Sequence, residues 1–140
     1  RDTEMAAMLL QAGASVDRAG ERGGTLLHSA VWGESVEMTD ILLNNGANTV
    51  QRDDEDEAPL HIAARKGNLA IAKLLIEHDA QTDDQSSAHL RAPLHYACEN
   101  GDAAMIALLL EAHATPSVTD RLARSPLHLA CIFAAKPFDN

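Results

Sequence analysis

Short runs of apolar residues alternate with glycines and polar turn residues, and their arrangement recurs along the chain. Between residues 53 and 86, the stretch 61–66 is predicted to be a short helix that Gly67 and Asn68 end. The stretch 69–77 is apolar on nearly all sides and is predicted to be a second helix, which neighbours must cover on both sides. The pattern thus predicts a unit of two short helices.

A recurring tetrapeptide sets the length of this unit. Its copies stand at 25–28, 58–61, 92–95 and 125–128. Their final histidines are 33, 34 and 33 residues apart, and three copies carry proline two residues before the histidine, where it suits the first turn of a helix. A dipeptide ending in alanine keeps a fixed distance from the first three histidines, so the one extra residue must lie between Ala80 and Ala92. That stretch is rich in turn residues and tolerates insertion.

These units resemble the ankyrin repeat, whose signature joins a Thr-Pro-Leu-His helix start, a glycine after the first helix, a leucine pair in the second and Gly-Ala before a hairpin. The leucine pairs stand at 9–10, 42–43, 74–75 and 108–109. The resemblance implies an all-α fold with short β-hairpin loops, an ankyrin-repeat α-solenoid of stacked helix-turn-helix units. We expect a single domain over residues 1–140, with a partial repeat at 1–19, repeats at 20–52, 53–86 and 87–119, and a partial repeat at 120–140.

Some positions depart from the family pattern. Asp79 and His113 stand where a glycine usually ends the second helix, and Asp56, Leu90 and Ala123 replace the glycine that helps to turn the hairpin tip. A left-handed backbone at such positions costs a non-glycine residue about 1 kcal/mol, which the fold should tolerate. Because of the extra residue, we also expect an unusual geometry for the hairpin within 81–91.

Composition and charge narrow the picture. The chain is 46% apolar but only 3% aromatic, and its many alanines and leucines favour closely packed helices over a sheet. Its net charge of −10 opposes binding to phosphate backbones, so we expect no direct contact with nucleic acid. The longest apolar run, 103–110, is far shorter than the roughly 20 residues that span a bilayer, so we expect no membrane insertion.

Cys98 and Cys131 occupy the same place in successive first helices. One repeat of translation exceeds the reach of about 7 Å between Cα atoms that a disulfide allows. We therefore expect two free thiols that serve as small core residues, with redox activity as the alternative. Unpaired cysteines and the lack of a glycosylation sequon favour a cytoplasmic or nuclear protein, which we expect to be a monomer. The chain opens on Arg1, which predicts a fragment of a larger ankyrin-repeat protein.

Four histidines at regular spacing, His28, His61, His95 and His128, raise the question of a metal site. Stacked repeats lie about 10 Å apart, whereas zinc needs its ligands within about 2.1 Å of one ion. The resemblance instead implies that these histidines fasten hairpin loops through ring-nitrogen hydrogen bonds. We therefore expect neither a metal nor a cofactor.

Nucleophilic catalysis would need a hydroxyl or thiol near a histidine and a carboxylate. Ser125 with His128 is the nearest pair in sequence, but Thr25 with His28 repeats it, as a helix-capping position would. The segment 20–24 is rich in glycine but lacks the Lys-Ser/Thr that completes a phosphate-binding loop. The sequence therefore predicts no enzyme.

The resemblance places partner contacts at the hairpin tips and at the ends of the first helices. The expected contacts are Glu21, Arg22, Trp32, Asp54, Glu55, Glu57, Arg65, Lys66, His89, Arg91, Glu99, Arg121, Arg124 and Phe133. The acidic run 53–57 is either a solvated turn or a patch that attracts a basic segment of another protein. Trp32 is either a binding anchor or packs locally on a neighbouring tip. Arg91, Arg121 and Arg124 predict a basic end of the same groove.

A solenoid offers an extended surface that suits binding to another protein. The leading hypothesis is a non-catalytic protein–protein interaction module or scaffold. The alternative is a recruiting domain of a larger enzyme, such as a ubiquitin-ligase subunit or a kinase, or of an ion channel.

Overall fold

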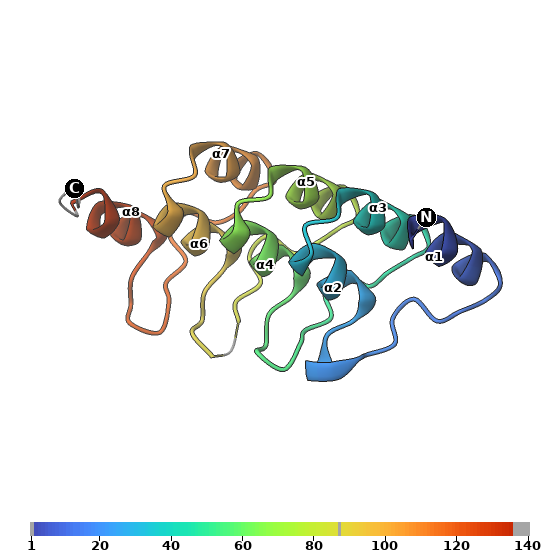
Figure 1. Ribbon diagram of the computed structural model, residues 1–140. Coiled ribbons are helices and arrows are strands. Elements are labelled where there is room, and N and C mark those ends of the chain that lie inside the picture. Colours follow the sequence, from blue (N-terminus) through green and yellow to red (C-terminus); the bar gives the residue numbers. More distant parts are fainter. Residues whose placement is uncertain (1, 87, 136–140) are drawn as a thin grey trace, which may run out of the picture.

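The computed structural model describes residues 2–86 and 88–135, which form two rows of short helices (Figure 1). The first row holds α2 (Leu26–Trp32), α4 (Pro59–Lys66), α6 (Pro93–Asn100) and α8 (Pro126–Ala134). The second row holds α1 (Asp2–Gln11), α3 (Val36–Asn44), α5 (Leu69–Glu77) and α7 (Ala103–Glu111). A 3-10 turn, η1 (Glu21–Gly23), precedes α2. The expected all-helical solenoid is confirmed.

The sequence explains where the helices begin. In the first row, Pro59, Pro93 and Pro126 each occupy the first helical position, where the missing N–H removes no hydrogen bond. In the second row, α3, α5 and α7 begin after polar residues whose side chains accept the backbone N–H three residues further on. These caps are Ser35, Asn68 and Asp102. Helices α2, α4 and α6 are therefore short, because the start signal of the next helix follows closely on each of them.

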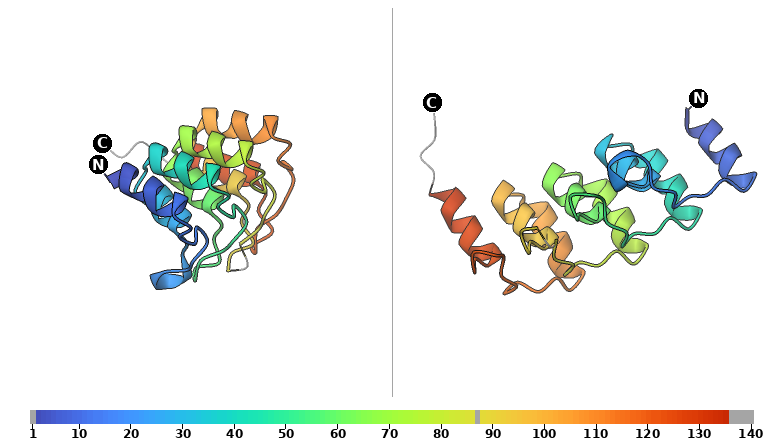
Figure 2. Two further views of the ribbon diagram at one scale, coloured as in Figure 1. Left: turned by 90° about the vertical axis from the view of Figure 1, so that its right-hand side faces the viewer. Right: turned by 90° about the horizontal axis from the view of Figure 1, so that it is seen from below.

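The rows stack in register. Helices α2, α4 and α6 each contact the next first-row helix and the second helix of their own unit, and seen from below the stack follows an arc from α1 to α8 (Figure 2). Leucines at equivalent places, Leu27, Leu60 and Leu94, are all buried in the core. Ala63 and Ala97 have no exposed surface, and their small side chains let neighbouring helices approach closely. This arrangement accounts for a core with few aromatic residues.

Hairpin loops project in one direction from the first row (Figure 1). We name the ends of these loops tips, at residues 20–24, 53–57, 86–91 and 120–124. In each tip the N–H of the first residue donates to the carbonyl of the last. In the described ranges the tips carry no β-strand, so the hairpins are closed turns. The tip at 86–91 is one residue longer than the others, which confirms where the extra residue lies and that this hairpin is unusual.

Several non-glycine residues adopt left-handed backbone conformations. Asp79 and His113 have φ values of 64° and 67°, as expected for the glycine position after a second helix. Asp56, Leu90 and Ala123 have φ values of 61°, 51° and 58° at the corresponding place in three tips. These residues therefore keep the family's turn geometry at the cost of backbone strain.

The helices at the two ends of the stack are less covered than the inner ones. Leu9 of α1 is 63% exposed, whereas Leu42, its equivalent in α3, is 2% exposed. Cys98 and Cys131 are both free thiols, but only Cys98 is buried. The expectation that both cysteines pack in the core is therefore wrong for Cys131, because no described helix covers that side of α8. In the described residues, no helix is long and apolar enough to cross a membrane.

Candidate protein-binding surface

Buried histidines join α2, α4 and α6 to the tips that follow them, whereas His128 of α8 is exposed. The N–H of Ala58 donates to Nδ1 of His61 at 3.1 Å, so Nε2 carries the ring proton and donates to the carbonyls of Asp84 at 2.8 Å and Arg91 at 3.1 Å. The same bonds run from His28 to the carbonyl of Glu57 and from His95 to that of Arg124. Burial lowers the pKa of His61 and of His95, which favours this neutral form. The rings thus fix the positions of the tips.

Ser125 and His128 have the geometry of a helix start. Ser125 Oγ lies 2.7 Å from His128 Nδ1, and Thr25 Oγ1 lies 2.9 Å from His28 Nδ1 in the same arrangement. The repetition supports the capping interpretation over a catalytic one. The part of the chain that the structure describes holds no group of three or more His, Cys, Asp or Glu side chains that could bind a metal ion.

The acidic run 53–57 is not an open patch of five carboxylates. Asp53 Oδ1 accepts the N–H groups of Glu55 and Glu57, both at 3.0 Å, because the tight turn leaves these donors without backbone partners. Asp56 pairs with Arg52 at 2.7 Å. Glu57 is buried, so only Asp54 and Glu55 are exposed. The expectation of a five-residue surface patch is wrong for this reason.

Glu57 holds two neighbouring side chains in place. Its Oε2 pairs with Arg65 at 2.6 Å, and its Oε1 accepts the hydroxyl of Tyr96 at 3.0 Å. Burial and the Glu57 charge raise the pKa of Tyr96 to about 12. Glu57 was predicted to contact a partner, but with 4% exposure it is too buried to do so and instead positions Arg65 and Tyr96 from below.

Tyr96 is absent from the predicted contacts although it lies at the centre of the surface. Its place in α6 corresponds to Ile62 in α4 and Leu129 in α8, both apolar. A buried tyrosine at this place needs a hydrogen-bond partner for its hydroxyl. This need was the one feature of the sequence that could have identified Tyr96 as a site residue. The partner, Glu57, lies 39 residues earlier in the chain.

Aromatic rings and cations alternate across three units. The Arg65 guanidinium lies 4.9 Å from the ring centroid of Trp32 and 5.9 Å from that of Tyr96. Lys66 Nζ lies 5.1 Å from the Trp32 ring, and the Arg91 guanidinium lies 5.5 Å from the Tyr96 ring. Trp32 nevertheless remains 44% exposed. It therefore packs locally and still offers indole surface to a partner.

Ion pairs neutralise much of the predicted basic end. Arg91 pairs with Glu99 at 2.6 Å, and Arg124 pairs with Asp120 at 2.8 Å. Burial alone would raise the pKa of Asp120, but hydrogen bonds from Arg124 and from the N–H of Leu122 lower it overall. Arg91 and Arg124 thus do not act as free cations, and the expected charge gradient along the groove is weaker than the sequence suggests.

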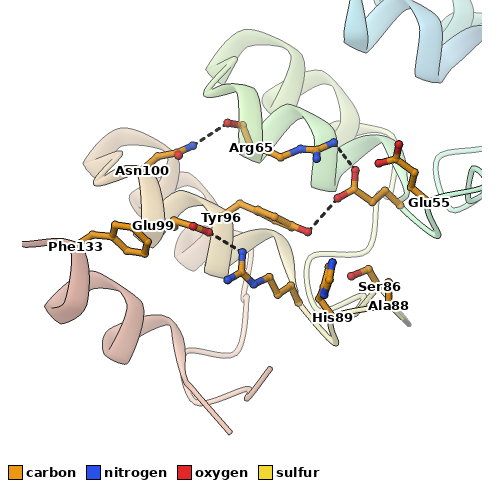
Figure 3. A pocket seen from close by; sticks show the side chains of 11 residues that line it. Glu55, Arg65, Ser86, Ala88, His89, Tyr96, Glu99, Asn100 and Phe133 are labelled. Atoms are coloured by element: carbon orange, nitrogen blue, oxygen red, sulfur yellow. Dashed lines mark hydrogen bonds and ion pairs between the residues drawn. The ribbon is translucent and has the colours of Figure 1, made fainter. Parts of the chain in front are cut away.

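Two hollows lie side by side on this surface. The first has a volume of about 730 Å³, and Figure 3 shows Tyr96 and Arg65 on its wall with Glu55, Ser86 and His89 on the side of the tips. We name it the Tyr96 hollow. The second, of about 470 Å³, is lined by Trp32, Arg22, Asp53 and Glu55, and we name it the Trp32 hollow. Glu55 lines both hollows, so the two are adjacent.

The remaining predicted contacts are distributed along this surface. Arg22, His89 and Arg121 are exposed at tips. Lys66 lies 3.8 Å from Glu34, and Phe133 lines the Tyr96 hollow from α8. The side chain of Glu21 lies outside the described residues.

The sequence is similar to a family model and to several known proteins. The family model for ankyrin repeats, in three copies, matches residues 1–86 and 47–120. Protein phosphatase 1 regulatory subunit 27 of Mus musculus is 38% identical over 74 residues, which cover 50% of this chain and 48% of that protein.

Two longer proteins match over a small part of their length. RelA-associated inhibitor of Mus musculus is 38% identical over 60 residues, 43% of this chain and 7% of that protein. E3 ubiquitin-protein ligase KEG of Arabidopsis thaliana is 31% identical over 83 residues, 59% of this chain and 5% of that protein. The chain thus spans less than half the length of each of these relatives.

The family match extends over more than half of the chain, and the paired helices, stacked rows and projecting tips recur at the same period. This chain belongs to the ankyrin-repeat family, whose repeats are protein-interaction modules.

Proposed function

We propose that this chain is a non-catalytic interaction module that binds a partner protein across its tips and first-row helices. The observation that carries the proposal is the row of side chains from Trp32 through Arg65 and Tyr96 to Arg91. Ion pairs and buried hydrogen bonds hold these groups in place before a partner arrives. Binding therefore needs little side-chain ordering, which favours affinity.

The proposed contacts are the sequence-predicted ones without Glu57. They are Glu21, Arg22, Trp32, Asp54, Glu55, Arg65, Lys66, His89, Arg91, Glu99, Arg121, Arg124 and Phe133. Trp32 is the proposed anchor, because exposed aromatic groups contribute strongly to binding at interfaces. We also propose a monomeric cytoplasmic or nuclear protein, with neither cofactor nor nucleic-acid ligand, on the grounds of its acidic charge and unpaired thiols.

Affinity capture from extracts of the source organism tests this surface. Trp32→Ala combined with Glu55→Lys should abolish retention of a partner that the unchanged chain retains. Lys73→Ala combined with Glu77→Lys changes exposed residues of α5, in the second row, and is the matched control that should retain it. Retention of every specific partner by the Trp32/Glu55 variant would refute the proposed surface.

A second candidate is a recruiting domain of a larger enzyme or channel. The similarity to a ubiquitin ligase over 5% of that protein's length favours this possibility. The coding sequence on both sides of residues 1–140 tests it. A catalytic or channel domain in the same polypeptide would support recruitment, and a polypeptide without one would favour a free-standing scaffold.

A further inference from the structure

The basic and the acidic side chains of this surface differ in whether they have an ion-pair partner. Arg65, Lys66, Arg91 and Arg124 each have a carboxylate partner within the chain. By contrast, no ion pair joins the carboxylates of Asp53, Asp54 and Glu55 to a basic side chain in the described residues. An acidic partner would have to compete with internal ion pairs for these four cations, whereas a basic partner meets the exposed carboxylates of Asp54 and Glu55, which have no ion pair to break.

The Trp32 hollow has the volume and the charged lining to take a long basic side chain. Its described lining holds two carboxylates, Asp53 and Glu55, and one guanidinium, Arg22. The exposed part of the Trp32 indole can cover the methylene groups of an arginine or lysine, since such side chains bury their stems on apolar surface. The charged end then meets Glu55, and arginine adds the possibility of two parallel hydrogen bonds.

The neighbouring Tyr96 hollow disfavours a second cation. Two guanidinium groups, those of Arg65 and Arg91, line it beside the Tyr96 ring. Their charges are balanced by Glu57 and Glu99, and the remaining carboxylate on the wall, Glu55, is shared with the Trp32 hollow. Once Glu55 pairs with a cation in the Trp32 hollow, no unpaired carboxylate is left in the described lining for a second cation, so an uncharged residue fits in the Tyr96 hollow without breaking an ion pair.

Ser86 adds an independent sign of a ligand in the Tyr96 hollow. This residue is 1% exposed, lines the hollow, and its Oγ has no hydrogen-bond partner among the described residues. A buried polar group without a partner is uncommon, and an incoming polar group can satisfy it. Figure 3 shows its oxygen on the side of His89, which lines the same hollow.

The geometry points to a partner segment that places an arginine or lysine in the Trp32 hollow against Glu55 and an uncharged, hydrogen-bonding residue in the adjacent Tyr96 hollow. This inference rests on the proposed function and specifies the chemistry of the partner. Glu55 forms the shared wall, so the two residues lie close together in the partner's sequence.

Selection from phage-displayed random peptides tests the inference on the whole 140-residue chain. The selected peptides should share one arginine or lysine with an uncharged residue a few positions away. Changing that basic residue to alanine should weaken binding about tenfold, and Glu55→Gln in the protein should do the same. When both changes are combined, little further loss is expected, because both remove the same interaction.

The controls separate this inference from the proposed function. Glu111→Gln removes an exposed carboxylate at the end of α7, away from both hollows, and should leave binding unchanged. Peptides that lose affinity with Trp32→Ala but share no basic residue, or that ignore Glu55→Gln, would overturn the inference and leave the proposed surface intact. Peptides that ignore Trp32→Ala as well, or a selection that yields no binders, would overturn both.

Discussion

At the scale of single residues, the protonation state of the buried histidines determines whether the tips are fixed. His61 accepts the N–H of Ala58 through Nδ1 and donates through Nε2, so a second ring proton would remove the acceptor. His95 makes the equivalent pair of bonds. The folded state therefore favours the neutral form of these two histidine rings and opposes their protonation.

This arrangement predicts a loss of stability in mild acid. Burial lowers the folded-state pKa of His61 and His95 below the value of 6.5 expected for the unfolded chain. The unfolded state therefore takes up protons first, so the stability contribution is complete above pH 6.5 and is lost as the pH falls through the folded pKa. Urea denaturation between about pH 7 and pH 5 should show a falling free energy of unfolding.

A comparison of variants separates this effect from the other titrating groups. His61→Gln should be less stable but should depend less on pH over the same range. His113→Gln changes an exposed histidine and should keep the pH dependence of the unchanged chain. An equal pH dependence in all three proteins would contradict the role assigned to His61.

At the scale of the elements, the tips combine a closed turn with a strained backbone. Ala123 lies in the tip 120–124 with φ of 58°, and its N–H donates to the carbonyl of Asp120. The Asp120 carboxylate also accepts the N–H groups of Leu122 and Arg124. These bonds hold Ala123 in a conformation that an L-residue disfavours.

Glycine at this place should stabilise the chain, in contrast to glycine in a helix. Ala123→Gly removes the left-handed strain and should raise the free energy of unfolding by about 1 kcal/mol, less the entropy that glycine adds to the unfolded chain. Ala107→Gly makes the same change at an exposed position of α7 and should lower it by about 1 kcal/mol. Urea denaturation measures both, and a destabilised Ala123→Gly variant would argue against strain at the tip.

The elements themselves could be predicted well from the sequence. The predicted helices 61–66 and 69–77 correspond to Pro59–Lys66 and Leu69–Glu77, because proline, glycine and asparagine mark their ends locally. Five left-handed positions also followed from alignment with glycines in the repeat pattern, whereas those of Arg22 and Glu34 were not predicted. Local signals of this kind need no knowledge of distant contacts.

The candidate site was harder to predict because pairing between units decides it. From the sequence, Glu57 is predicted to be one of five exposed carboxylates at a tip. Its burial depends on Arg65 and on Tyr96 of the next unit. Arg124, by contrast, pairs with Asp120 within its own tip, and this local ion pair was not predicted. The structure places most of the sequence-predicted residues on one face, but which charges have an ion-pair partner depends on side-chain geometry within and between repeats.

At the scale of the whole molecule, the main contacts of each described unit are with its neighbours, so stability should be local. Leu42, Leu75 and Leu109 occupy the same buried place in successive second helices, and Leu9 occupies it in α1 with most of its surface exposed. Trp32, the single tryptophan, lies in α2 and reports on the units at that end of the stack. A lesion far from α2 should therefore affect tryptophan fluorescence less than total helix content.

Leu109→Ala should separate these two signals. Removal of the buried side chain should destabilise its unit by about 2–5 kcal/mol, since the cavity adds to the lost burial. In urea, circular dichroism should then show an early loss of helix, while Trp32 fluorescence changes at a higher concentration. Leu42→Ala places the same lesion beside α2 and should move both signals to lower urea, whereas Leu9→Ala, at an exposed leucine, should move neither by much. Coincident transitions in the Leu109→Ala variant would show that the units unfold as one cooperative block, because a lesion at one end would then be felt equally by Trp32 near the other.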